Sequence, residues 1–288
     1  MASGRLLRWL HRDAAPRWGV DPHELDPDAL RVTLAKAARL FRVGGYFDLD
    51  LGGWERLPPA PALLVSNHSG GTSIPDVWGF GVGWYLRHGL ARPLHPLAHE
   101  IILSTPATAR YFGRRGVLRA RPETAWRALV EARRDVLVLP GGDRDTWRPF
   151  SRRWEVEFAG RVGYAKLALR AGAPVVPVAH AGAHETLVVL SDGSRLARAV
   201  GLHGLVRAEI WPVHLSLPWG LAFGPWPHIP LPARMSYRFG PPIDPREYGG
   251  PTERPSERAV RALDAAVRGS IQSMLAELRA ERAGGRAL

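Results

Sequence analysis

One histidine and one aspartate flank a turn that contains two glycines. The apolar run Ala62–Ser66 is typical of a short buried strand, and Asn67 and His68 follow it directly. Asp76 stands near the start of a stretch that predicts a helix. An imidazole is the usual general base at neutral pH, and a carboxylate on its second nitrogen orients it. The pattern therefore points to proton abstraction at His68, with Asp76 as its partner.

The same residues also fit a purely structural interpretation. Ser73 and Asp76 have the spacing of a capping box, with Pro75 in the first turn of the helix. Under this interpretation, Asp76 caps the helix and His68 is an ordinary loop residue.

A second apolar strand, predicted over Asp135–Leu139, runs into a Pro-Gly-Gly sequence followed by two arginines. Glycines at a strand end expose backbone N–H groups that hold anions, and arginine binds phosphate through paired hydrogen bonds. A tight turn with solvated arginines is the structural alternative. The candidate substrate-binding residues of this segment are Gly141, Gly142, Arg144 and Arg148.

A third segment begins with a predicted strand over Pro174–Val178. His180, His184 and Glu185 follow it. On a helix the two histidines would share a face and could hold a metal. Because the run follows a strand and contains a glycine, the pattern favours residues that line a pocket beside His68, and no metal site is predicted.

The elements that must position these residues alternate along the chain. Short apolar strands separated by amphipathic helices predict an α/β fold with a mostly parallel central sheet flanked by helices. The expected organisation is an N-terminal helical segment over 1–45, an α/β domain over 46–250 and a C-terminal amphipathic helix within 251–288. The predicted helices are Asp28–Val43, Pro75–Arg87, Ile101–Phe112, Pro122–Arg134, Arg161–Ala171 and Ser256–Ala283. The other predicted strands are Tyr46–Leu51, Arg92–Ala98 and Met235–Phe239.

Composition narrows the chemistry. The chain has 288 residues, 45% of them hydrophobic, enough for one large domain with a substantial core. It has no cysteine, which excludes disulfides, zinc–thiolate sites and thiol nucleophiles.

The charge balance predicts an anionic partner. The chain carries 39 basic and 27 acidic residues, a formal net charge of +12. It has neither zinc-finger spacing nor an RNA-binding aromatic signature, so a phosphorylated substrate or an anionic membrane surface is favoured over nucleic acid. No secretory signal and no run approaching the ~18 apolar residues of a spanning helix is found. We therefore expect a cytoplasmic, peripherally membrane-associated protein.

Membrane contact is expected from the Trp- and Pro-rich segment Arg207–Met235, which cannot be one regular element, and from the basic first helix. The alternative is that these tryptophans pack in the core. For the last helix, packing on the sheet is favoured.

Taken in order, these segments resemble the glycerolipid acyltransferase superfamily of the 1-acylglycerol-3-phosphate acyltransferase type, and within it the diacylglycerol-acyltransferase-like branch. The His-x4-Asp block of the family is similar to the segment from Asn67 to Asp76. Its Pro-Gly-Gly block is similar to residues 140–142, and its Val-Pro-Val strand to residues 176–178. Two departures stand out: His68 and Asp76 are eight positions apart rather than five, and Gly141 replaces the glutamate of the common third block. Asp76 can then reach His68 only if residues 69–73 loop out.

The resemblance implies O-acyl transfer, as in phospholipid biosynthesis, from an acyl thioester (acyl-CoA or acyl carrier protein) to a glycerolipid or lysophospholipid hydroxyl. It implies no cofactor besides this co-substrate and no covalent enzyme intermediate. Backbone N–H groups near Gly70 and Gly71, or near Gly141 and Gly142, would stabilise the oxyanion. The other substrate-binding residues that it suggests are Asn67 and, for the family's arginine, Arg119 or Arg121.

Two other classes fit the same residues. One is a thioester or lipid hydrolase, in which water replaces the lipid hydroxyl. The other is a non-catalytic lipid-binding protein on the same fold, which the longer spacing between His68 and Asp76 keeps open.

Overall fold

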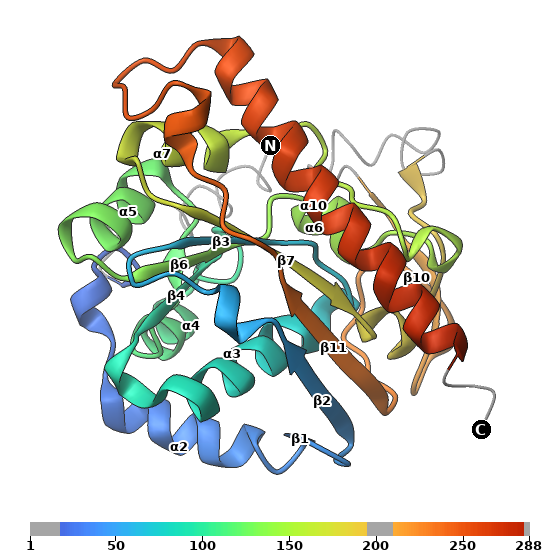
Figure 1. The fold of residues 1–288 in the computed structure, drawn as a ribbon. Coiled ribbons are helices and arrows are strands. Elements are labelled where there is room, and N and C mark those ends of the chain that lie inside the picture. The colour runs from blue at the N-terminus through green and yellow to red at the C-terminus, as the bar shows by residue number, and fades with distance from the viewer. Residues whose placement is uncertain (1–17, 195–209, 285–288) are drawn as a thin grey trace, which may run out of the picture.

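An eight-stranded sheet forms the centre of the protein in the computed structural model, which describes residues 18–194 and 210–284 (Figure 1). The strand order is β1-β2-β11-β7-β3-β6-β4-β5. Neighbouring strands are parallel except β7 and β11, which are antiparallel. The predicted α/β fold with a mostly parallel sheet is therefore confirmed. The strands are β1 (Phe41–Arg42), β2 (Phe47–Gly52), β3 (Leu63–Ser66), β4 (Leu94–Ala98), β5 (Leu118–Arg119), β6 (Asp135–Val138), β7 (Val175–Ala181) and β11 (Ala233–Phe239).

Helices cover both faces of this sheet (Figure 1). They are α2 (Pro27–Ala37), α3 (Pro75–His88), α4 (Pro106–Gly113), α5 (Pro122–Trp126), α6 (Gly142–Thr146), α7 (Gly163–Ala171) and α10 (Glu257–Gly284). A π-helix over Arg127–Glu131 continues α5. In the described part of the chain, no helix is long and apolar enough to cross a bilayer.

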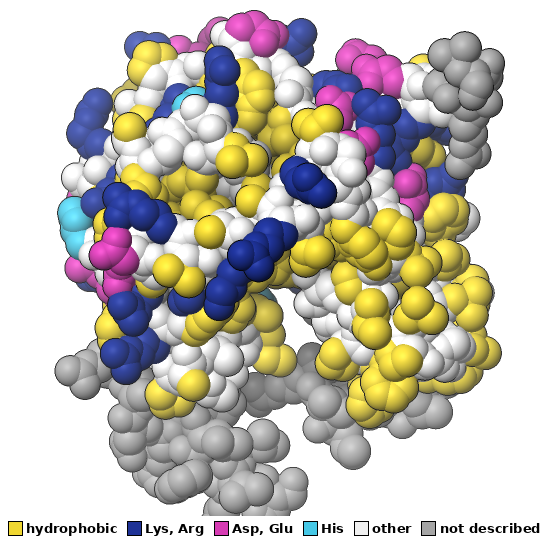
Figure 2. All heavy atoms as spheres, turned by 90° about the horizontal axis from the view of Figure 1, so that it is seen from below, with side chains coloured by type: hydrophobic (Ala, Val, Ile, Leu, Met, Phe, Trp, Pro, Cys, Tyr) yellow, Lys and Arg dark blue, Asp and Glu magenta, His cyan; other side chains and the backbone are white. Residues whose placement is uncertain are grey.

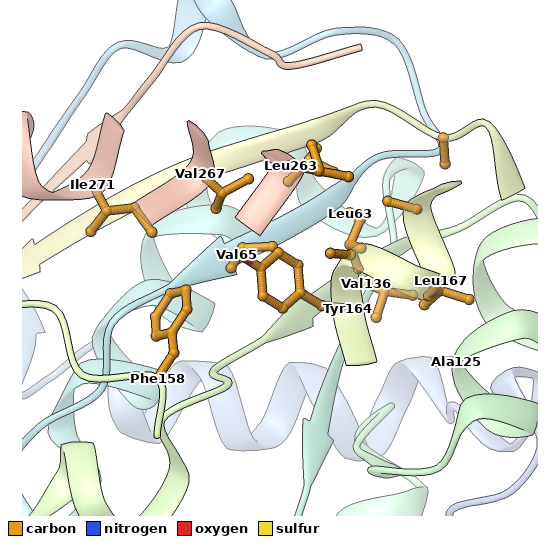
Figure 3. Packing of buried hydrophobic residues seen from close by; sticks show 14 of the residues in the cluster. Leu63, Val65, Ala125, Val136, Phe158, Tyr164, Leu167, Leu263, Val267 and Ile271 are labelled. Carbon is orange, nitrogen blue, oxygen red and sulfur yellow. The ribbon is translucent and has the colours of Figure 1, made fainter. Parts of the chain in front are cut away.

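Alternating side chains of the central strands pack into two hydrophobic cores, one on each face of the sheet. Leu63 and Val65 of β3 pack with α5, α7 and α10, whereas Leu64 packs on the opposite face with α3. Figure 3 shows the first of these cores, in which Val267 and Ile271 of α10 point towards β3. The favoured packing of the last helix on the sheet is confirmed, because its apolar stripe is buried.

Two predicted helix boundaries are wrong. α2 ends at Ala37, and Phe41, which continues the helical spacing, instead pairs in a parallel strand with Phe47. α4 begins at Pro106 rather than Ile101, because the Thr105 side chain accepts the Thr108 N–H and caps the helix there. Ile101, 71% exposed, precedes the helix in a turn.

A second, three-stranded antiparallel sheet was not predicted. It has the order β10-β9-β8, with β8 (Val188–Ser191), β9 (Val213–Ser216) and β10 (Gly220–Phe223). Two of these strands come from the Trp- and Pro-rich segment, of which residues 207–209 lie outside the described residues. Pro218, one of the prolines that argued against one regular element, lies between β9 and β10.

Candidate active site

The chain turns sharply where β3 ends at Ser66, and His68 and Asp76 meet there. The His68 Nδ1 atom lies 2.5 Å from Asp76 Oδ2. The His68 side chain keeps 13% of its surface exposed, whereas that of Asp76 keeps 2%. The expected contact between the two side chains across eight positions is therefore confirmed.

The intervening loop takes up the extra residues in a 3₁₀ turn over Gly71–Ser73. Gly70 and Gly71 on its N-terminal side and Ile74 on its C-terminal side adopt left-handed backbone conformations. A Cβ on Gly70 would lie 2.5 Å from Pro75 Cδ, so glycine is required there. The loop that the spacing demanded thus exists and is tightly packed.

Asp76 is held by several hydrogen bonds. Its Oδ2 also accepts the Ser69 N–H at 2.9 Å, and its Oδ1 accepts the Val77 N–H at 2.9 Å. The Tyr237 hydroxyl donates to the Asp76 carbonyl at 2.8 Å. Burial opposes ionisation of Asp76, but the charge and hydrogen bond of His68 prevail and lower the pKa of the carboxyl. Asp76 is therefore a fixed, ionised partner for the imidazole.

The capping-box interpretation is wrong. The residue that precedes the first turn of α3 is Ile74, which has no side-chain cap. Ser73 Oγ instead donates to the His228 carbonyl at 3.0 Å. Neither member of the supposed box caps the helix as that pattern requires.

Asp145 is a site residue that was not predicted from the sequence. Its Oδ2 accepts the backbone N–H of His68 at 2.6 Å, and its Oδ1 forms an ion pair with Arg148. Both side chains are almost fully buried, at 0% and 1% exposure. Arg148, predicted to bind phosphate, therefore faces the interior, and burial lowers its pKa to about 10. The available signal was an acid just after the Pro-Gly-Gly turn, since β3 and β6 are adjacent parallel strands whose C-terminal ends meet.

Asn67 ties β3 to β7 rather than facing solvent. Its amide donates to the His180 carbonyl at 2.8 Å, and its Oδ1 accepts the His180 N–H at 2.8 Å. A void of about 10 Å³, at the lower limit for one water, lies behind the dyad and is lined by Asn67, Asp76, His180 and Tyr237 among others. Burial lowers the pKa of His180 to about 4, so this imidazole is neutral. His180 therefore borders this small void with Asp76, and the role of the segment in lining a substrate pocket beside His68 stays a prediction.

The Pro-Gly-Gly turn is a close-packed junction. A Cβ on Gly141 would lie 2.1 Å from the Glu157 carbonyl oxygen, so no larger residue fits. The Gly142 N–H donates to the Leu139 carbonyl at 3.2 Å. Arg161 Nη1 donates to the Gly141 carbonyl at 2.9 Å. Arg144 is exposed on α6.

Arg119 and Arg121 lie elsewhere. Arg119 is in β5, the outermost strand, separated from β3 by β6 and β4. Its guanidinium forms an ion pair with Glu100 and donates to the Leu103 carbonyl at 2.8 Å. Arg121 Nε donates to the same glutamate at 2.6 Å. The structure does not bring these arginines to the dyad.

The histidines of the third segment do not form a metal centre with Glu185. Among residues 18–194 and 210–284, no group of three or more His, Asp or Glu side chains is placed to hold a metal ion. Glu185 Oε1 accepts from Arg282 at 2.5 Å, and burial lowers the pKa of His184 well below its usual value.

Sequence comparisons find relatives of this chain. No family model matches the chain. It is 28% identical over 266 residues to an uncharacterized protein of Mycobacterium tuberculosis, covering 92% of this chain and 71% of the relative. An uncharacterized protein of Mycobacterium leprae is 28% identical over 264 residues, covering 91% and 68%.

A solved structure shares the architecture. The 1-acyl-sn-glycerophosphate (LPA) acyltransferase PlsC of Thermotoga maritima aligns with 96% of this chain and 88% of its own, at a TM-score of 0.51 and 16% identity. At this identity the likeness shows the fold, and the fold is the one that the resemblance of the ordered segments implied.

Proposed function

We propose that this chain is an O-acyltransferase that moves an acyl group from an acyl thioester to the hydroxyl of a glycerolipid or lysophospholipid. The observation that carries the proposal is the 2.5 Å contact between His68 Nδ1 and Asp76 Oδ2 at the C-terminal end of a central strand. The PlsC-like fold and the ordered segments support this reaction class over others that use a His–Asp pair. We also propose that the chain belongs to the diacylglycerol-acyltransferase-like branch of this superfamily.

In the proposed reaction, neutral His68 carries its proton on Nδ1 and donates it in a hydrogen bond to ionised Asp76. Its Nε2 takes the proton of the acceptor hydroxyl, and the hydroxyl oxygen attacks the thioester carbonyl carbon. Collapse of the tetrahedral intermediate forms the ester and breaks the C–S bond. The proton on Nε2 then passes to the leaving thiolate, so His68 returns to its starting state.

The oxyanion of the intermediate needs backbone donors close to His68. The Gly142 N–H is already used by the Leu139 carbonyl. We therefore place the oxyanion at the Gly70–Gly71 turn, whose glycines are separated from the dyad histidine by Ser69 alone. Of the predicted arginines near the site, exposed Arg144 is the one proposed to contact an acceptor phosphate.

Thiol release tests the proposal directly. Because the chain contains no cysteine, a thiol reagent reports only the coenzyme A released from acyl-CoA, and the acyl product then distinguishes transfer from hydrolysis. With acyl-CoA and lysophosphatidate, we expect acceptor-dependent thiol release and a new ester by thin-layer chromatography. His68→Ala should lower kcat by about 10²–10⁴-fold, the usual contribution of a general base.

Two further variants sharpen the result. Asp76→Asn should lower kcat by a comparable factor, because an amide no longer fixes the tautomer or stabilises the imidazolium. His99→Ala, at an exposed histidine outside the site, is the matched control and should keep wild-type activity. Near-normal ester formation by a folded His68→Ala variant would refute the proposal. Thiol release that yields free fatty acid would assign a hydrolase, and bound lipid without turnover would assign a lipid-binding protein.

A further inference from the structure

We propose that the outer face of the small sheet is a docking surface for a lipid bilayer. We call it the docking face, and it consists of Leu215, Trp219, Leu221, Phe223, Trp226 and Ile229. Their exposures range from 44% to 56%. The docking itself goes beyond the proposed function and does not depend on turnover.

The small sheet is buried on its inner face and apolar on its exposed outer face. Val189, His214 and Ala222 point inward and are 2%, 0% and 7% exposed. Leu215 and Leu221 are paired across β9 and β10 on the outer face, at 44% and 53% exposure. An antiparallel sheet with one face in water normally alternates apolar inward and polar outward. A contiguous apolar outer face instead marks a contact surface.

The absence of charge on this segment identifies the occupant. Residues 210–233 contain no Asp, Glu, Lys or Arg, although 23% of the whole chain is charged. Figure 2 shows hydrophobic side chains gathered on the lobe at its lower right, the side on which Figure 1 places β10. A phosphorylated ligand or an acidic carrier protein needs cations on the surface that binds it. The hydrocarbon boundary of a bilayer needs none, and it favours tryptophan.

The indole N–H groups of the two tryptophans in the docking face are hydrogen-bonded within the chain. Trp219 Nε1 donates to the Pro227 carbonyl at 2.6 Å, and Trp226 Nε1 donates to the Phe223 carbonyl at 2.8 Å. The rings lie 6.1 Å apart. Because both N–H groups are satisfied within the chain, inserting the rings into lipid leaves no donor without a partner.

The docking face is attached to the loop that carries the dyad. Thr72 Oγ1 donates to the Trp226 carbonyl at 3.1 Å, and Ser73 Oγ donates to the His228 carbonyl at 3.0 Å. A chain bound through this face would therefore hold the loop between His68 and Asp76 at the lipid surface. This step rests on the proposed function, in which the acceptor hydroxyl belongs to a lipid.

Vesicle flotation of the full chain tests the docking. The informative variant is the double substitution Leu221→Thr and Phe223→Thr, which removes the apolar side chains but introduces β-branched residues that suit a strand. The matched control is Leu86→Gln with Ile101→Thr, which replaces side chains that are 67% and 71% exposed outside the small sheet. Vesicles of phosphatidylcholine, alone and with phosphatidylglycerol, are compared at low salt and at high salt, where charge attraction is screened.

We expect the wild type to float with both vesicle types at high salt. Each docking side chain removed should lower the partition coefficient by about five- to tenfold, and the control should float like the wild type. The double variant should therefore bind neutral vesicles at least about twentyfold more weakly, with an unchanged melting temperature. Its co-flotation at wild-type levels, or a wild-type dimer that dissociates in the double variant, would overturn the proposal. An inactive chain that still floats through this face would refute the proposed function and leave the docking intact.

Discussion

The buried pair of Asp145 and Arg148 yields the strongest test of how the site is held. Asp145 accepts the His68 N–H at 2.6 Å with one oxygen and pairs with Arg148 through the other. The substitution Asp145→Asn removes the charge but keeps an oxygen that can accept from His68. It therefore separates the effect of the ion pair with Arg148 from the effect of the hydrogen bond to the His68 N–H.

The expected magnitudes follow from burial. Asp145→Asn leaves the guanidinium of Arg148, 1% exposed, without a counter-charge, which costs about 3–5 kcal/mol of stability. For a domain of this size that is a fall of about 10 °C in melting temperature. The bond to His68 changes from charge-assisted to neutral, a loss of about 1 kcal/mol, so kcat should fall about five- to tenfold. This is far less than the loss expected for His68→Ala.

A double variant tests whether the ion pair between Asp145 and Arg148 stabilises the fold. Arg148→Met alone should also lower the melting temperature, because it leaves the buried Asp145 carboxylate without a counter-charge. Asp145→Asn combined with Arg148→Met should melt above either single variant, because no uncompensated charge is left. Differential scanning calorimetry and the thiol-release assay measure the two effects. Single variants that melt within about 2 °C of the wild type, or a double variant that melts below both, would contradict this account.

Two further predictions concern stability. Gly70→Ala forces a side chain into a left-handed conformation against Pro75 and should cost about 1–3 kcal/mol, read as a lower melting temperature; an unchanged value would mean that the loop is less confined than its 2.5 Å Cβ approach indicates. His95 is fully buried, its Nδ1 lies 2.8 Å from the Gly116 carbonyl, and burial lowers its pKa from 6.5 to about 4. The unfolded chain therefore binds the proton more readily, so this histidine's contribution of about 3 kcal/mol is complete above pH 6.5 and is lost as the pH falls towards 4. His95→Asn should flatten the fall in melting temperature across this window, and an equally steep fall in the variant would assign the pH dependence to other groups, such as His180.

Much of the site was predictable because parallel strands gather their C-terminal ends. Apolar runs alternating with helices indicated that β3, β6 and β7 lie in one sheet, and their following segments do meet around His68. Local pattern could not indicate that β11 runs antiparallel to β7, since the strands of the small sheet lie between them along the chain and interrupt the alternation of strands and helices. It also could not separate Phe41 as a strand residue from the helix before it, because one buried aromatic fits both periodicities.

The direction in which an arginine side chain points could not be predicted from the sequence. Arg144 and Arg148 follow the same glycine turn, and both residues suggested an anion site. In the structure, Arg144 is exposed, whereas Arg148 is turned inward by Asp145, three positions earlier. Only the packing of α6 against the end of β3 decides between these outcomes, so a motif that counts basic residues overestimates the binding surface.

The spacing between His68 and Asp76 shows why sequence separation is a weak guide to contact. Their side chains meet at 2.5 Å because the Gly71–Ser73 turn, entered through left-handed glycines, folds the intervening residues out of the way. That turn is fixed by distant parts of the chain, since His228 packs against Gly71 and accepts from Ser73 through its carbonyl. The geometry of the dyad thus depends on a segment some 150 positions later in the sequence, the same segment that carries the docking face. A perturbation of that face should therefore reach the catalytic pair through two hydrogen bonds, without any change in the residues that define the motif.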